Sequence, residues 1–271
     1  GNWGPFAAAN YNMGWHSKGG HDRTFGTNAK AWDWCSVNNA GFEYYQNAKK
    51  DGIGLPPHNP RIWVFRHQSN ASCAPMLRRV WHPIGYSSNS GWSNFFINIT
   101  AGRLLTYTNT LLKFALPDIV IGTGGGYNTY DIYESVNHEL SHASHFNKVG
   151  SAFWAKYVNY VITYGKKYDH PYGDASCNNS GFCGVGEMWG YAMGYIRTYE
   201  KYQQKPKNGQ SKWFQPNLLY DLMTEKILTK KQIFDCLSSD VTSHALLKQK
   251  MISRYPSKKD SIIAKFSRYG F

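Results

Sequence analysis

The stretch that organises this chain is residues 136–146, which read Val-Asn-His-Glu-Leu-Ser-His-Ala-Ser-His-Phe. Within it, His138, Glu139 and His142 form the pattern His-Glu-x-x-His. Residues four apart lie on the same face of an α-helix, so His138 and His142 can direct two imidazole nitrogens at one point. Glu139 lies about 100° around the helix from His138, close enough for its carboxylate to reach a water at that point. The pattern therefore predicts a metal site with a general base beside it.

The surrounding residues favour a helix for this motif. Thr129 or Asp131 can cap its start, and Asp131 with Glu134 approximates a capping box. An apolar stripe at helical spacing follows, made of Ile132, Val136, Leu140 and Ala143. The alternative is an ordinary amphipathic helix whose histidines are solvated or hydrogen-bonded.

The chemistry of such a site suits Zn²⁺. Two imidazoles and a third protein ligand leave one position for water, and zinc lowers the pKa of that water to about 7. Glu139 would then take the proton as general base.

His138, Glu139 and His142 resemble the signature of the zincin metallopeptidases. The resemblance implies that the two histidines bind zinc, that Glu139 is the base, and that the reaction is hydrolysis of a peptide bond. It covers this helix and, more weakly, a third ligand downstream. The metzincin subgroup is excluded, because its pattern needs Gly and then His where this chain has His145 and Lys148.

The candidates for the third metal ligand are His145, Asp169, His170, Asp174 and Glu187. His145 is too far along the helix, since His138 and His145 are about 10 Å apart along the axis while zinc–nitrogen bonds are about 2.1 Å. Asp169, His170 and Asp174 lie in a polar loop, where charged residues are common without any functional role.

We predict Glu187 as the third metal ligand. It follows Gly184-Val-Gly186 and opens an apolar helix whose same face continues as Gly190, Tyr191 and Gly194. Two glycines four apart cost helix stability, about 1 kcal/mol each, unless another group must approach closely. A carboxylate on a second, closely packed helix is the gluzincin arrangement, which this stretch resembles. The alternative is a glutamate favoured only by a helix N-terminus.

Tyr191 lies four residues after Glu187 and should face the same way. We predict that its hydroxyl stabilises a developing oxyanion, a role that a Tyr or His fills in zinc peptidases. The alternatives are simple packing, or the same role for His170 or Tyr172.

The composition limits the partners. The formal charge is +13, but the basic residues are scattered apart from a cluster near the C-terminus, and no nucleic-acid-binding motif accompanies them. The sequence contains no stretch of 18 apolar residues, so it predicts no membrane span. The 20 Tyr and 10 Trp supply core volume and can also line a cleft for an extended peptide. We therefore expect a peptide or protein substrate, no nucleic acid and no membrane span.

The five cysteines form neither a dense disulfide framework nor a Cys-x-x-Cys metal site. Cys177 and Cys183 bracket a short polar loop, where a disulfide and two thiols are equally compatible with the sequence. No signal peptide is visible, and the chain opens without Met, which is typical of a mature or truncated chain. We expect an extracytoplasmic, secreted or cell-surface protein.

The first 150 residues predict helices and a small sheet. A helix is expected over residues 29–50, with Gly41 as a point where it can break, and Gly52 and Gly54 at its end. Strands are expected over residues 61–67, 80–84, 94–100 and 118–121. The glycines of residues 122–126 lack the spacing of a nucleotide-binding loop and instead predict a sharp turn into the motif helix.

The rest of the chain predicts mainly helices. We expect one helix from Ser151 to Gly165, a loop over residues 165–186, and a helix from Glu187 to about Tyr202. A linker follows at residues 205–209. Four short helices are expected over residues 216–226, 230–237, 241–254 and 260–268, with Thr229 as an N-cap and Pro256 ending the third.

Together these features predict one zincin-like α+β catalytic domain over residues 1–271. Its N-terminal lobe, residues 1–150, would hold a small mixed sheet and the motif helix, and its C-terminal lobe, residues 151–271, would be mainly helical. The predicted function is a zinc metallopeptidase. The alternatives are a non-catalytic zinc-binding adhesion module, which has no use for Glu139, and a zinc hydrolase of a non-peptide amide.

Overall fold

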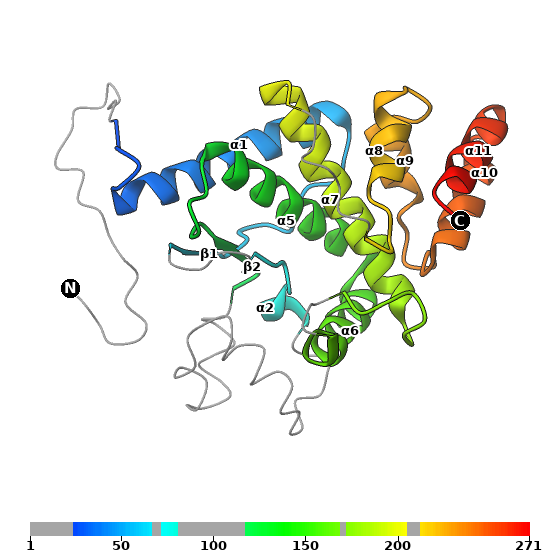
Figure 1. The fold of residues 1–271 in the computed structure, drawn as a ribbon, viewed down its shortest axis with the longest axis horizontal. Coiled ribbons are helices and arrows are strands. Elements are labelled where there is room, and N and C mark those ends of the chain that lie inside the picture. Colours follow the sequence, from blue (N-terminus) through cyan, green and yellow to red (C-terminus); the bar gives the residue numbers. More distant parts are fainter. Residues whose placement is uncertain (1–23, 67–71, 81–116, 169–171, 205–211) are drawn as a thin grey trace.

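A computed structural model describes residues 24–66, 72–80, 117–168, 172–204 and 212–271 (Figure 1). The described part is rich in helix and contains a two-stranded parallel sheet. In chain order its elements are α1 (Lys30–Asp51), β1 (Ile62–Phe65), α2 (Leu77–Val80), β2 (Ile119–Gly122), α5 (Thr129–Val149), α6 (Ser151–Tyr168), α7 (Ser180–Tyr202), α8 (Asn217–Thr224), α9 (Lys230–Cys236), α10 (His244–Arg254), the 3₁₀ helix η2 (Pro256–Lys258) and α11 (Lys259–Arg268).

The sheet pairs β1 with β2 in parallel, with Ile62 opposite Ile119 and Phe65 opposite Gly122. Cys73 forms an isolated antiparallel bridge to Val120 on the other side of β2. β2 is buried along its whole length, as expected of a strand covered on both faces. The predictions of strands at residues 61–67 and 118–121 are confirmed.

The predicted strand at residues 80–84 is wrong at its first residue, because Val80 ends the short helix α2. The Asp118 carboxylate holds α2 in place by accepting hydrogen bonds from the side chains of Arg78 and Arg79. Residues 81–84, the predicted strand at 94–100 and the linker at 205–209 lie outside the described residues.

Helix α1 confirms the prediction at residues 29–50, and it continues through Gly41 without a break. It ends at Gly52, whose φ of 68° is the left-handed conformation typical of a helix C-cap.

Helix α5 carries the His-Glu-x-x-His motif and begins one residue after its true N-cap, Asn128. The Asn128 side chain accepts from the backbone N–H of Tyr130 and Asp131, and the Asp131 carboxylate accepts from the Asn128 N–H. The predicted cap is therefore wrong by one residue for Thr129 and by three for Asp131. The capping box joins Asn128 and Asp131, not Asp131 and Glu134 as predicted. Gly125 and Gly126 have positive φ and turn the chain from β2 into α5, as predicted.

Helices α6 and α7 are both longer than predicted. α6 continues past Gly165 to Tyr168, and α7 begins at Ser180, so the predicted loop over residues 165–186 is wrong at both ends. Glu187 consequently lies inside α7 and does not open it. Gly181 and Gly184 lie in the first turns of α7, where neighbouring segments leave no room for a side chain. A Cβ on Gly181 would lie 1.9 Å from the Thr242 carbonyl oxygen, and one on Gly184 would lie 2.8 Å from the His244 ring.

Helices α8 to α11 follow the four predicted ranges closely. Thr229 caps α9 through a capping box with Gln232, as the sequence indicates. Pro256 follows the end of α10 and begins η2.

The core is built around α5, which packs against α1 and α7 (Figure 1). Two long-range hydrogen bonds join these helices. The Trp189 indole on α7 donates to the Ser141 carbonyl at 3.1 Å, and the hydroxyls of Tyr44 and Ser144 are 2.7 Å apart. The motif helix is thereby held on two sides. Among the described residues, no helix is both long and apolar enough to cross a membrane.

Candidate metal centre

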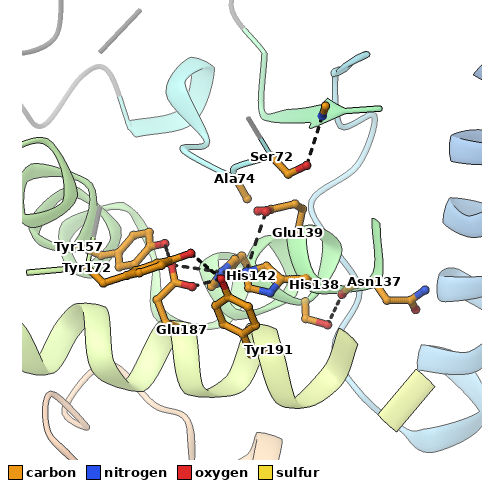
Figure 2. A network of polar contacts seen from close by, with 12 residues as sticks. Ser72, Ala74, Asn137, His138, Glu139, His142, Tyr157, Tyr172, Glu187 and Tyr191 are labelled. Carbon is orange, nitrogen blue, oxygen red and sulfur yellow. Dashed lines mark hydrogen bonds and ion pairs between the residues drawn. The ribbon is translucent and has the colours of Figure 1, made fainter. Parts of the chain in front are cut away.

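The imidazoles of His138 and His142 converge on one point on the buried face of α5 (Figure 2). Their Nε2 atoms are 2.8 Å apart. Both side chains are almost fully covered, and burial lowers the pKa of His138 to about 4. The His138 imidazole is therefore neutral at physiological pH, which is the form that binds a metal.

Glu187 reaches the same point from α7. Its carboxylate oxygens lie 3.5 Å from His138 Nε2 and 3.6 Å from His142 Nε2. Burial by itself raises the pKa of Glu187, but His142 and His138 outweigh burial and hold that pKa below its usual value. The structure thus brings the predicted third ligand into contact with both histidines.

Tyr157 on α6 donates a short hydrogen bond to Oε1 of Glu187. This contact orients the carboxylate towards the two imidazoles. Sequence reasoning missed it, because Tyr157 lies on the apolar face of α6 among Phe153, Trp154 and Val161, where an aromatic residue indicates packing alone.

Gly190 is what allows α7 to approach the histidines. A Cβ at this position would lie 2.7 Å from Nε2 of His142 and 3.1 Å from Nε2 of His138. One turn on, a Cβ on Gly194 would lie 3.2 Å from the Glu134 carbonyl oxygen. The prediction that these glycines mark a close approach between the two helices is consistent with this geometry.

Glu139 lies beside the two imidazoles and reaches towards them from the side of Ala74, whereas Glu187 comes from α7 (Figure 2). Its Oε1 is 3.9 Å from Nε2 of His138, and its Oε2 is buried without a hydrogen-bond partner among the described residues. Burial, assisted by the negative charge of Glu187, raises the pKa of Glu139 well above 4.5. A raised pKa is what a general base needs in order to accept a proton near neutral pH.

Tyr191 packs its ring edge-on against His138, with ring centroids 4.3 Å apart. Its hydroxyl is 2.7 Å from that of Tyr172 (Figure 2). Burial raises the pKa of both tyrosines well above 10, so both hydroxyls stay protonated and can donate hydrogen bonds. Tyr172 and Tyr191 are partly exposed, in contrast to His138, His142 and Glu187, which are buried.

The donor set suits a metal ion. The nitrogens of His138 and His142 and an oxygen of Glu139 all lie within 4.8 Å of one another. Of the two carboxylates, Glu187 contacts both imidazoles, whereas Glu139 approaches only that of His138 at 3.9 Å. The buried Oε2 atoms of both carboxylates have no hydrogen-bond partner in the described part of the chain. Such buried groups need a partner, and a cation held by two nitrogens and a carboxylate would supply one.

The other candidate ligands lie elsewhere. His145 is fully buried against the rings of Phe153 and Trp154 and does not join the centre. The Asp174 carboxylate accepts hydrogen bonds from Ser176. Asp169 and His170 lie outside the described residues.

Cys177 and Cys183 are both in the thiol form, so no disulfide joins them. Cys183 lies within α7, which begins at Ser180, and Cys177 precedes that helix.

Compared with known proteins, the chain matches no protein family, no curated protein and no solved structure. Its function must therefore be argued from the site itself.

Proposed function

We propose that this protein is a zinc metallopeptidase of the gluzincin type, in which His138, His142 and Glu187 hold the metal. The observation that supports this most directly is the convergence of two imidazoles from α5 and one carboxylate from α7. Beside them lies a second buried carboxylate, that of Glu139, whose Oε2 has no hydrogen-bond partner among the described residues. Nitrogen and oxygen donors in this number are those of catalytic zinc sites.

Zinc, when bound, would supply a Lewis acid that polarises the substrate carbonyl and acidifies an attacking water. Glu139 would accept the proton of that water and pass it to the leaving amine. Its raised pKa, caused first by burial, suits both halves of this transfer. A ligand carboxylate and a base carboxylate thus have different environments within one centre, since Glu187 has its pKa held low and Glu139 has its pKa raised.

The two tyrosines would stabilise the negative charge that develops on the carbonyl oxygen. Tyr191 is the nearer one, because its ring touches His138, and Tyr172 is hydrogen-bonded to it. Tyr157 would act indirectly by fixing the orientation of Glu187. Removal of a single donor to an oxyanion costs roughly 10² to 10³ in kcat in well-studied hydrolases.

The test is hydrolysis of a broad peptide library by the zinc-loaded protein, with a chelator as control. Glu139→Gln should keep about one zinc per chain while hydrolysis falls by roughly 10² or more, because the base is lost and the ligands remain. His142→Ala should lose both metal and activity, since two ligands seldom retain zinc.

Two results would contradict the proposal. One is full activity in Glu139→Gln. The other is a zinc-loaded wild-type protein that cleaves no peptide, which would favour the non-catalytic binding module or a non-peptide amide as substrate.

A further inference from the structure

Lys212 places a positive charge next to the metal centre. Its Nζ lies 4.6 Å from the ring centroids of both Tyr172 and Tyr191 and 5.9 Å from that of Phe214. Tyr191 in turn touches His138, so the ammonium is two ring contacts away from a proposed zinc ligand. Lys212 comes directly after residues that the structure does not describe and far from α5 in sequence, so no sequence pattern pointed to it.

The contacts of Lys212 differ from those of two other lysines that are buried or half-buried. Lys265 pairs with Glu225, and Lys230 pairs with Glu200 and Asp51. Within the described part of the chain, Lys212 contacts ring faces and pairs with no carboxylate. Aromatic faces attract an ammonium but accept none of its three hydrogen bonds in the way that a carboxylate does.

The negative charge of Glu187 acts on Lys212, but that carboxylate is already engaged by two imidazoles and by the Tyr157 hydroxyl. A divalent ion bound by two neutral imidazoles would be balanced by the carboxylates of Glu187 and Glu139, so neither carboxylate is left to pair with Lys212. Lys212 would then carry an unpaired positive charge beside the centre, next to the partly exposed Tyr172 and Tyr191. Such a charge favours an anionic ligand.

We propose that Lys212 binds a carboxylate of the substrate and so makes the site selective for peptides with a negative charge near the cleaved bond. This inference rests on the proposed peptidase function. A carboxylate gives Lys212 a charge-assisted hydrogen bond, which is about twice as strong as a neutral one. The aromatic rings beside the ammonium make its surroundings less polar than water, which strengthens that contact.

The distance between Lys212 and the centre indicates which carboxylate is bound. Ring contacts of 4.6 Å and 4.3 Å separate the ammonium from His138, and an extended peptide advances about 3.5 Å per residue. The carboxylate therefore belongs one or two residues from the cleaved bond. It is either the free C-terminus of a short leaving segment or the side chain of an Asp or Glu.

The test separates binding from catalysis by using zinc-loaded Glu139→Gln. Three peptides derived from one parent sequence are compared by calorimetric titration. The first has a free C-terminal carboxylate, the second has an amidated C-terminus, and the third is amidated and has one residue near the C-terminus replaced by Asp. We expect at least about tenfold tighter binding for one or both of the charged peptides than for the neutral one. The peptide that binds more tightly identifies the source of the carboxylate.

Lys212→Met in the same background should abolish that preference, whereas Lys212→Arg should retain part of it. Lys156→Met is the matched control, because Lys156 also lies over an aromatic ring, that of Phe182 at 5.2 Å, but away from the centre. Zinc content and thermal unfolding establish that each variant is folded. In the active protein, the ratio of kcat/KM for charged and neutral peptides should fall with Lys212→Met and not with Lys156→Met.

Equal affinity for all three peptides, or a preference that survives Lys212→Met, would overturn the role of Lys212. Failure of the peptidase proposal has a different signature, since zinc-loaded wild-type protein would then cleave none of the peptides, whatever their charge.

Discussion

At the scale of single residues, the centre depends on two glutamates with opposite environments. Glu187 is held between two imidazoles and a tyrosine hydroxyl, while Glu139 is buried with one oxygen that has no partner among the described residues. The first environment stabilises a carboxylate and the second destabilises it. This difference is the physical basis for assigning one glutamate as ligand and the other as base.

Glu187→Ala should weaken zinc binding by at least about 100-fold without unfolding the protein, because the variant removes one of three ligands and leaves no buried charge behind. Competition with a chelator of known affinity measures the change. Glu200→Ala, on the same helix but in surface contacts with Arg197 and Lys230, is the control and should bind zinc as the parent does. An unchanged zinc affinity in Glu187→Ala would mean that a different residue is the third ligand.

Tyr191→Phe should keep zinc but lower kcat by about tenfold or more, because it removes a hydroxyl that donates to the developing oxyanion. Tyr172→Phe is the comparison, since the two hydroxyls are 2.7 Å apart. If Tyr191→Phe cleaves peptides as fast as the parent while Tyr172→Phe does not, the oxyanion role belongs to Tyr172.

At the scale of elements, the centre exists because α5 and α7 approach closely at Gly190. At Gly190 the backbone of α7 lies so close to α5 that any side chain there would collide with the Nε2 atoms of His138 and His142. Gly usually lowers helix stability by about 1 kcal/mol relative to Ala. At this position the absence of a side chain permits the contact between Glu187 on α7 and the two imidazoles on α5.

Gly190→Ala should therefore impair the metal centre, in contrast to most Gly→Ala changes within helices. Overpacking costs about 1–3 kcal/mol, which corresponds to a roughly 5-fold to 150-fold loss of zinc affinity if the histidines must move apart. Gly186→Ala, one turn earlier, is the matched control, because its Cβ would meet the Tyr157 ring at an ordinary 3.5 Å. Zinc titration of both variants measures the effect, and equal affinities would show that α7 can shift without disturbing the ligands.

At the scale of the whole molecule, several buried histidines link stability to pH. Burial lowers the pKa of His138 to about 4, of His145 to about 3 and of His244 to about 4. Histidines in the unfolded chain titrate near 6.5, so between pH 6.5 and about 4 the unfolded state binds more protons than the folded state. Glu139 acts in the opposite sense above pH 4.5, because its raised pKa lets the folded state hold a proton that the unfolded state releases.

The metal-free protein should consequently lose stability as the pH falls from 6.5 towards 4. Three histidines outweigh one glutamate, so we expect a slope above about 1.4 kcal/mol per pH unit. Urea unfolding in the presence of a chelator at several pH values measures it. His145→Leu should remove the contribution of about one bound proton from this slope, which is about 1.4 kcal/mol per pH unit. His145 is suited to this test because it is fully buried and lies outside the proposed ligand set. A free energy of unfolding that does not change over this range would contradict the prediction.

Much of the local structure could be read from sequence because it depends on neighbours in the chain. The spacing of Ile132, Val136 and Leu140 indicated α5, and the separation of His138 and His142 placed both imidazoles on one face of it. Thr229 and Gly52 marked helix ends through capping, which involves only a few adjacent residues. The start of α7 was misjudged for the converse reason. Its first turns include Gly181 and Gly184, whose lack of a side chain allows contacts with Thr242 and His244, about 60 residues away in the chain, and no local pattern indicates those contacts.

The sequence by itself determined the motif helix, its two histidines and the glutamate between them, because these lie within one helical turn and a half and their geometry follows from helical periodicity. It also indicated Glu187, through the glycines that follow on the same helix face. Only the tertiary structure decided that Glu187 contacts both imidazoles, that Tyr157 orients its carboxylate, and that Lys212 lies over Tyr172 and Tyr191. These contacts join residues on different helices and segments, and their distances depend on how α5, α6 and α7 pack, which no local pattern specifies.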